Sequence, residues 1–255
     1  MNLRTVKIMR YVTPLREGGS LPAIVEADDD GMYVLKFRGA GQGVKALIAE
    51  LLGGEIGRAL GLPVPEIVFV ELDPLLARTE PDPEIQDLIK ASGGLNLALD
   101  YLPGSIMFDT LIQTIDARLA SGIVWFDAYT ANVDRTARNA NMLLWHKELW
   151  LIDHGAAFFY QHNPDTFLSN SANPFRQIKD HMLLNLADEI ETADREARAK
   201  LSPEILSELV GLIPDEWLED PENERRIYLE FLTERLKNSK SFVAEALDAR
   251  RNLHV

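Results

Sequence analysis

Two carboxylates and two or three carboxamides flank short apolar runs in the middle of this sequence, between residues 132 and 155. Asp134 precedes Asn139 by five residues, Asn141 follows, and Asp153 comes after two short apolar runs. Oxygen ligands of this kind suit Mg2+, which binds few protein groups and shares the oxygens of a substrate phosphate. A carboxylate on the preceding loop can accept the proton of an attacking hydroxyl. The segment therefore predicts a phosphoryl-transfer centre.

The two apolar runs, Met142–Trp145 and Leu149–Ile152, predict a β-hairpin that gathers these side chains. The residues between the runs are His146-Lys147-Glu148, so we expect a turn of three residues in which Trp145 pairs with Leu149. In this register, the polar residues that flank the two runs come together at the open end of the hairpin.

Asn141 lies opposite Asp153 in that register, and Asn139 lies just beyond. Both asparagines are therefore candidate metal ligands beside Asp153, and the sequence leaves the choice open. The competing interpretation is a structural turn cluster, because Asp and Asn side chains often bond nearby backbone in loops. The joint pattern, which includes Asp134 and the apolar-Asp-x-Gly sequence at 152–155, favours the metal site.

Residues 1–101 predict a small β-rich unit with one long helix. Short apolar runs alternate with turn residues, and Asp28-Asp29-Asp30-Gly31 is typical of a hairpin turn. Apolar residues recur at helical spacing between 44 and 60, and Gly61 predicts the end of that helix. The predicted strands cover 6–11, 23–27, 32–38, 67–72 and 95–99, and a short helix is predicted at 83–91.

Residues 102–255 predict a larger, mainly helical unit that follows a hinge at 100–104. The prolines after Ser202 and Asp220 mark two helix starts. The polar segment 163–174 predicts a loop of more than ten residues, a length that is often functional in a compact domain. A cleft between two such units is a usual place for a ligand site. Helices are predicted at 105–120, at 122–131 and over most of 175–251.

Lys36 is a second candidate functional residue, in the predicted strand of the N-terminal unit. Strand alternation places it on the face opposite Leu35 and Phe37. A lysine within an apolar strand favours an anionic partner, although a solvated outer face is an equal alternative. The helix at 44–60 carries Glu50 and Glu55, either of which could orient the ammonium or lie in solvent.

The loop before the first predicted hairpin contains Gly18, Gly19 and Ser20. Glycines allow backbone N–H groups to approach phosphate oxygens closely, so this loop is a candidate phosphate loop. The signal is weak, because any turn with two glycines has the same pattern.

Taken together, these residues resemble the HipA-like kinases, which share their catalytic plan with protein kinases and phosphatidylinositol kinases. The resemblance covers about 16–155, more than half of the chain. Four segments carry it in order: Val34-Leu35-Lys36-Phe37, the helix from Glu50 to the Leu60-Gly61-Leu62-Pro63-Val64-Pro65 ending, Asn132-Val133-Asp134-Arg135 with Asn139, and Leu151-Ile152-Asp153-His154-Gly155.

The resemblance implies a role for each matched residue. Lys36 would contact the α- and β-phosphates of ATP and pair with Glu50, and Asp134 would be the catalytic base. Asn139 and Asp153 would hold Mg2+, a role that Asn141 could share or take over. The remaining implied contacts with ATP are the hinge backbone at Asp100, Tyr101 and Leu102, which would face adenine, and the phosphate loop at Gly18, Gly19 and Ser20.

Three features depart from the pattern of the related kinases. His154 stands where phenylalanine is usual after the metal-binding aspartate, and Thr136 stands where many lipid-kinase-like loops have histidine. The spacing from Asn139 to Asp153 is one residue longer than the commonest one. None of these departures removes a predicted phosphate or metal ligand.

The composition narrows the classes of function. The chain has 255 residues and a formal net charge of −14, so we expect no direct binding of nucleic acid, although local cations and Mg2+ still permit nucleotide binding. It has no cysteine, and its five histidines lack zinc-ligand spacing. We find no apolar run long enough for a membrane span and no signal-peptide core, and therefore expect a cytoplasmic protein.

The predicted fold is α+β: a two-lobed protein-kinase-like fold with a small β-rich N-lobe at 1–101 and a larger, mainly helical C-lobe at 102–255. The predicted function is ATP- and Mg2+-dependent transfer of the γ-phosphoryl group to a hydroxyl, on a protein Ser or Thr, and the acceptor is unidentified. The alternatives are a lipid or small-molecule kinase, a nucleotidyl transferase on the same fold, and a non-catalytic pseudokinase that serves as a binding module.

Overall fold

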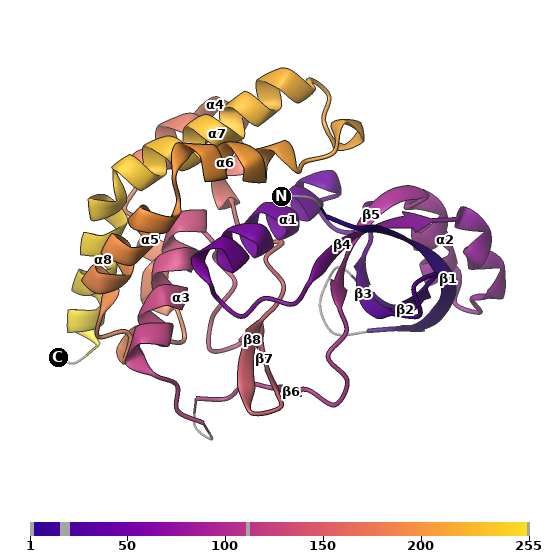
Figure 1. The fold of residues 1–255 in the computed structure, drawn as a ribbon, viewed down its shortest axis with the longest axis horizontal. Coiled ribbons are helices and arrows are strands. Elements are labelled where there is room, and N and C mark those ends of the chain that lie inside the picture. The colour runs from indigo at the N-terminus through magenta and orange to yellow at the C-terminus, as the bar shows by residue number, and fades with distance from the viewer. Residues whose placement is uncertain (1–2, 16–20, 111–112, 254–255) are drawn as a thin grey trace.

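A closed five-stranded β-barrel forms the N-terminal part of the chain (Figure 1). The computed structural model describes residues 3–15, 21–110 and 113–253. Neighbouring strands are antiparallel except β1 and β4, whose parallel pairing closes the barrel. The strands are β1 (Thr5–Pro14), β2 (Ala23–Ala27), β3 (Met32–Lys36), β4 (Ile67–Leu72) and β5 (Gly94–Asp100), in the order β1-β2-β3-β5-β4.

The barrel interior is filled by apolar side chains that alternate along the strands, including Leu35 and Phe37. Three predicted strands agree with the structure to within a residue at each end, whereas β1 is longer than predicted. β3 ends at Lys36, two residues before the predicted end. Its pairing stops there because the backbone N–H of Arg38 donates to the side chain of Asn96 at 2.8 Å.

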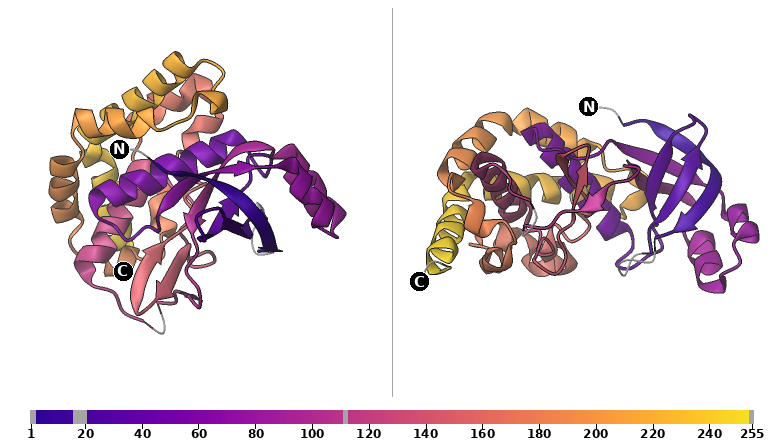
Figure 2. Two further views of the ribbon diagram at one scale, coloured as in Figure 1. Left: turned by 45° about the vertical axis from the view of Figure 1, so that its right-hand side comes forward. Right: turned by 90° about the horizontal axis from the view of Figure 1, so that it is seen from below.

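The helix α1 (Val44–Leu60) lies between the barrel and the C-terminal helices (Figures 1 and 2). It has the predicted bounds and ends at Gly61, whose φ of 80° is a left-handed conformation that glycine adopts without strain. Two shorter helices follow the barrel strand β4. They are η1 (Pro74–Thr79) and α2 (Pro83–Ala91), and α2 also has the predicted bounds.

The C-terminal part is built around α3 (Ala117–Thr130), which is nearly fully buried among later helices. One hydrophobic cluster combines α1, α3 and those helices, and a second fills the barrel. In the described part of the chain, no helix is long and apolar enough to cross a bilayer. The later helices are η2 (Phe159–His162), α4 (Pro164–Phe167), η3 (Leu168–Ala172), η4 (Arg176–Asp180), η5 (Leu184–Leu186), α5 (Ile190–Lys200), α6 (Pro203–Gly211), η6 (Asp215–Trp217), α7 (Pro221–Lys237) and α8 (Ser239–Asn252).

The prediction of two helices at 105–120 and 122–131 was wrong. A single helix begins after Asp116, whose side chain accepts a hydrogen bond from the N–H of Leu119 at 3.3 Å. Residues 106–107 instead form the short strand β6 (Ile106–Met107). It pairs with β7 (Met142–Trp145), which also pairs with β8 (Glu148–Leu151), in a second sheet of order β6-β7-β8.

The prediction of an irregular loop at 163–174 was also wrong, because α4 and η3 occupy most of it. The buried guanidinium of Arg235 on α7 fixes this segment by donating to the carbonyls of Ser171 and Asn173 at 3.0 and 3.1 Å. It also donates to the carbonyl of Tyr129 at the end of α3, at 2.7 Å. The two predicted helix starts at Ser202 and Asp220 are confirmed, and both side chains cap their helices.

Candidate active site

Lys36 lies between two carboxylates that come from distant segments of the chain. Its Nζ atom is 2.8 Å from Oδ1 of Asp153 and 3.7 Å from Oε2 of Glu50. Burial lowers the pKa of Lys36, but attraction by the two carboxylates outweighs burial and raises the pKa overall. As the strand alternation predicts, the lysine is on the face opposite Leu35, outside the barrel core. The contact joins β3, α1 and the residues after β8.

Glu50, rather than Glu55, is the helix carboxylate that faces Lys36. Both acids are buried on α1, so the prediction that they could be solvated was wrong for both. Glu55 instead pairs with Arg58 one turn later, at 3.1 Å, and burial raises its pKa. Burial would also raise the pKa of Glu50, but Lys36 and His154 more than offset this effect and hold that pKa well below its usual value.

His154 is fully buried beside Glu50, with its Nδ1 atom 3.4 Å from Oε1 of the carboxylate. Its ring packs edge-on against Phe126 of α3 at 5.7 Å between ring centroids. The backbone of α1 can approach this closely because residue 53 is glycine, where an added Cβ would lie 2.8 Å from Cβ of His154. The histidine at this position therefore packs the Asp153 segment against both α1 and α3.

Asp134 lies on the loop before β7 with its carboxylate facing two asparagine side chains. Its Oδ2 atom accepts a hydrogen bond from Nδ2 of Asn139 at 2.8 Å, and Nδ2 of Asn141 is 3.5 Å away. Burial raises the pKa of Asp134, and the negative charge of nearby Asp153 raises it further, whereas the two amides act in the opposite direction. The structure thus brings Asp134, Asn139, Asn141 and Asp153 to one place.

The predicted hairpin forms, but its predicted register was wrong by one residue. Met142 pairs with Leu151, and the turn contains only His146 and Lys147, both with positive φ (51° and 70°). Positive φ at both central residues defines a turn whose twist matches that of paired strands. Sequence reasoning missed this turn because it lacks the glycine or asparagine that usually marks it.

The corrected register places Asn141 opposite Ile152 rather than Asp153, since the carbonyl of Asn141 accepts the N–H of Ile152 at 3.0 Å. Asn141 and Asp153 both have left-handed backbone, with φ of 47° and 55°. This conformation is uncommon outside glycine, although Asn and Asp tolerate it, and it turns both residues out of the strand geometry. Strained backbone of this kind is concentrated at functional sites.

Asp127, on the buried face of α3, anchors the loop that carries Asp134. Its carboxylate accepts hydrogen bonds from Nε of Arg135 at 2.6 Å and from Nδ2 of Asn132 at 2.8 Å. It also contacts Nε2 of His181 at 2.8 Å. Nδ1 of His181 accepts the N–H of Leu183 at 3.1 Å, so Nε2 carries the hydrogen and donates it to Asp127.

This buried network fixes both ends of the loop. Oδ1 of Asn132 accepts the N–H of Asp134 at 3.2 Å, and the guanidinium of Arg135 donates to the carbonyl of Asn141. Burial would raise the pKa of Asp127, but Arg135 and His181 outweigh burial and lower it to about 2. The sequence analysis did not identify Asp127. The available signal was an acidic residue inside the apolar run from 123 to 129, which indicates a buried carboxylate.

Two of the three backbone N–H groups of the predicted hinge form hydrogen bonds within the protein. The N–H of Asp100 donates to the carbonyl of Glu66 at 2.8 Å, and the N–H of Tyr101 donates to that of Met32 at 3.0 Å. Within the described residues, the N–H of Leu102 has no such partner. The predicted phosphate-loop residues Gly18, Gly19 and Ser20 lie outside the described part of the chain.

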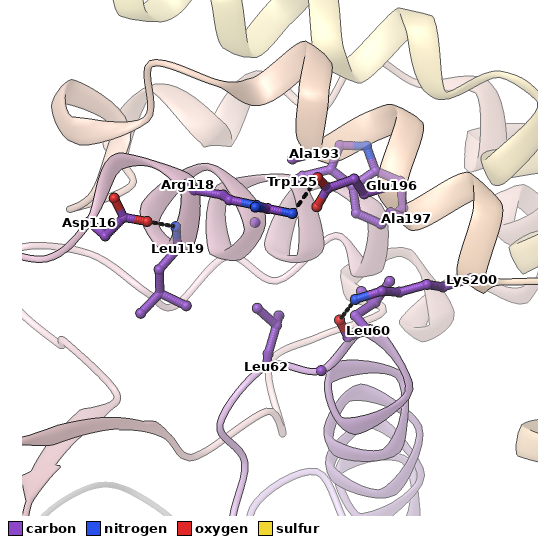
Figure 3. Close-up of a pocket in the computed structure, with 12 residues that line it drawn as sticks. Leu60, Leu62, Asp116, Arg118, Leu119, Trp125, Ala193, Glu196, Ala197 and Lys200 are labelled. Carbon is purple, nitrogen blue, oxygen red and sulfur yellow. Dashed lines mark hydrogen bonds and ion pairs between the residues drawn. The ribbon is translucent and has the colours of Figure 1, made fainter.

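A separate cavity of about 290 Å³ lies where the end of α1 meets α3 and α5 (Figure 3). Its charged side chains already have partners in the protein. Arg118 pairs with Glu196 at 2.6 Å, and the ammonium of Lys200 donates to the carbonyl of Leu60. These contacts stabilise helix packing, and none of the predicted site residues lines this cavity.

Comparisons with known proteins identify a protein family and similar solved structures. A family profile described as HipA-like kinase matches residues 8–244. Among solved structures, the chain is similar to the Helicobacter pylori proinflammatory kinase CtkA, with 13% identity, a TM-score of 0.58 and 100% of both chains covered. It is also similar to a Golgi casein kinase, with 10% identity, a TM-score of 0.50, and 99% of this chain and 75% of that chain covered. No curated protein matches the sequence. The structural likenesses support a kinase-like α+β fold.

Proposed function

This chain belongs to the HipA-like kinase family and is a phosphotransferase, and on that basis we propose that it transfers the γ-phosphoryl group of ATP to a Ser or Thr hydroxyl of a protein. The observation that carries this proposal is the position of Lys36 between Glu50 and Asp153. We assign residues 1–101 to an N-lobe and 102–255 to a C-lobe, with the nucleotide between them.

Lys36 is proposed to bind the α- and β-phosphate oxygens. Its ammonium is fixed by Glu50 from the helix side, so it can turn from Asp153 to the phosphates without losing its buried partner. A positioned cation of this kind stabilises the charge that phosphoryl transfer redistributes among the phosphate oxygens. The depressed pKa of Glu50 supports the assignment, because Glu50 stays ionised and keeps Lys36 oriented.

The residues near Asp153 fit a hard divalent cation. The Asp153 carboxylate is 41% exposed, and it lies near enough to Asp134 to raise the pKa of that acid. In the described ranges, no three His, Cys, Asp or Glu side chains form a metal-binding group, so the amide oxygens of Asn139 and Asn141 would complete the oxygen set with Asp153. Bound Mg2+ would supply charge neutralisation at the β- and γ-phosphates.

Asp134 is proposed to accept the proton of the acceptor hydroxyl. The hydrogen bond from Asn139 orients its carboxylate, and its raised pKa favours taking up a proton. The anchored backbone on both sides of Asp134 keeps that orientation fixed. Of the hinge residues Asp100, Tyr101 and Leu102, the N–H of Leu102 is the one that we assign to adenine, because the other two are already bonded.

The direct test is the loss of phosphoryl transfer in an Asp153→Ala variant. We expect Mg-ATP-dependent phosphorylation to fall by about a hundredfold or more, because charge stabilisation at the phosphates is lost. The matched control is Asp165→Ala, which changes an exposed acid on α4 that forms no ion pair in the described structure. Circular dichroism would show whether both variants fold. Full activity in folded Asp153→Ala would rule out this site.

Mass spectrometry of the products distinguishes the remaining alternatives on the same fold. Transfer of a phosphoryl group adds the mass of HPO3 to the acceptor, whereas a nucleotidyl transferase adds an AMP moiety. A product mass found on protein, rather than on a lipid or small molecule, identifies the acceptor class. We expect the phosphoryl mass on protein Ser or Thr.

A further inference from the structure

Three exposed cations near the candidate site form no ion pair with the residues that the structure describes. Arg138, Arg176 and Lys179 are exposed, and none forms an ion pair or side-chain hydrogen bond in the described ranges. Many other lysines and arginines are paired in this chain, whose acidic residues outnumber its basic ones by 14. Arg138, Arg176 and Lys179 are therefore exposed positive charges on a protein that is acidic overall.

The two segments that carry these cations lie side by side. Thr136 pairs antiparallel with His181, and the N–H of Met182 donates to the carbonyl of Arg135 at 3.2 Å. Arg138 lies in the tight turn between Thr136 and Asn139, whose backbones exchange two hydrogen bonds at 3.0 and 3.1 Å, and Asn139 in turn bonds the carboxylate of Asp134. Lys179 precedes His181 by two residues, so both cations lie on segments that contact the loop of Asp134.

The short helix η4 places Arg176 and Lys179 on the same face. Side chains three residues apart eclipse each other on a 3-10 helix, so Arg176 and Lys179 share one face. Both line a cavity of about 600 Å³, together with Asp180 and Tyr160. The helix is held by buried side chains of Phe175 and Ile178, so the cations extend from a fixed support.

The segment that carries η4 contacts the loop of Asp134 at residues other than those of the proposed nucleotide site. Lys36, Glu50 and Asp153 form the proposed nucleotide side, whereas the backbone next to Asp134 contacts the segment that follows η4. An acceptor chain that approaches Asp134 from outside the nucleotide residues would pass beside that segment.

We propose that Arg138, Arg176 and Lys179 bind the acidic residues of an acceptor segment, so that this kinase favours Ser or Thr flanked by Asp or Glu. The inference rests on the proposed function, because it assigns the acceptor side of the same site. The preference for acidic residues follows from the positive charge of these three side chains. Carboxylates next to the acceptor hydroxyl would gain ion pairs here and would be repelled by the acidic remainder of the surface.

The test uses synthetic peptides with one central serine and either glutamate, lysine or glutamine on both sides. Binding of each labelled peptide is measured by fluorescence anisotropy without nucleotide, and phosphorylation is measured with Mg-ATP. The test variant is Arg176→Glu/Lys179→Glu. The matched control is Arg198→Glu/Lys240→Glu, which changes the net charge equally at unpaired cations on α5 and α8.

We expect the wild type to bind the glutamate peptide at least about tenfold more tightly than the lysine peptide. Each surface ion pair adds a small binding free energy, and several such pairs together give this difference in affinity. The preference should disappear in the test variant, persist in the control and weaken as salt is added. Equal affinity for the two peptides, or equal loss in both variants, would overturn the proposal. A wild type that shows no thermal shift with Mg-ATP would count against the proposed function instead, and the anisotropy result would still decide the acceptor proposal.

Discussion

Lys36 joins two segments of the chain by contacting one carboxylate from each. It bridges Glu50 on α1 and Asp153 after β8, and both contacts arise from tertiary structure. Strand alternation predicted which face Lys36 occupies, because that depends on local geometry alone. The helical pattern could not choose between Glu50 and Glu55, since both are buried and only the packing of α1 against β3 decides which one meets the lysine.

Replacing Lys36 by methionine should make stability depend on pH in a defined way. At neutral pH, the unfolding free energy should fall by about 3 kcal/mol, because Glu50 keeps a buried charge without its main partner. In the wild type the lowered pKa of Glu50 contributes stability above its unfolded pKa, and that contribution is lost as the pH falls. In the variant, burial raises that pKa, so protonation relieves the cost in acid.

Urea denaturation at a series of pH values measures this effect. The stability gap between wild type and Lys36→Met should narrow between about pH 7 and about pH 4, with Lys240→Met on α8 as the control. A gap that stays constant or widens toward acid would show that Glu50 does not depend on Lys36 for its charge.

At the scale of elements, α3 positions the loop that carries Asp134 through Asp127. The carboxylate holds Asn132 and Arg135 of the loop and His181 of the following segment. Elements with local signals were predicted well: α1 and α2 have apolar spacing and clear end signals, and their bounds are confirmed. The contacts of Asp127 with His181 and of Arg235 with Tyr129 were not predicted, because these partners are 54 and 106 residues apart in the sequence.

An Asp127→Asn variant tests this positioning role. The lowered pKa of Asp127 contributes stability that is present above its unfolded pKa and lost as pH falls toward about 2. The contribution corresponds to roughly 2 kcal/mol. The variant should therefore be less stable at neutral pH and lose less stability than wild type between about pH 4 and pH 2.

Urea denaturation of Asp127→Asn and of the exposed control Asp248→Asn would measure this difference. A merely structural role would change stability alone, whereas a positioning role should also lower kcat while the KM for ATP stays nearly constant. Parallel acid profiles for wild type and Asp127→Asn would count against a charged Asp127 in the folded protein.

At the scale of the whole molecule, the barrel and the helical part meet at α1 (Figure 1). Lys36 at the end of β3 adds a contact with Asp153 after β8. The hydrophobic cluster that contains α1 and α3 also includes Leu97 and Leu99 of β5, so the junction is packed rather than loosely linked. The predicted α+β class agrees with this structure, in which the five barrel strands precede α3 in the chain. The sequence did not predict the correct register of the β7–β8 hairpin, because the two-residue turn contains neither glycine nor asparagine.

The proposed function requires that one site bind Mg-ATP through Asp153 and transfer its phosphoryl group with the help of Asp134. The most direct measurement compares wild type, Asp134→Asn and Asp153→Asn for thermal stabilisation by Mg-ATP and for phosphate transfer. At a nucleotide concentration of about 100 Kd, binding should stabilise wild type and Asp134→Asn by about 2.7 kcal/mol. Transfer by Asp134→Asn should fall by about a hundredfold or more, whereas Asp153→Asn should lose both responses. Transfer that persists in folded Asp153→Asn, or stabilisation lost in Asp134→Asn alone, would contradict the claim.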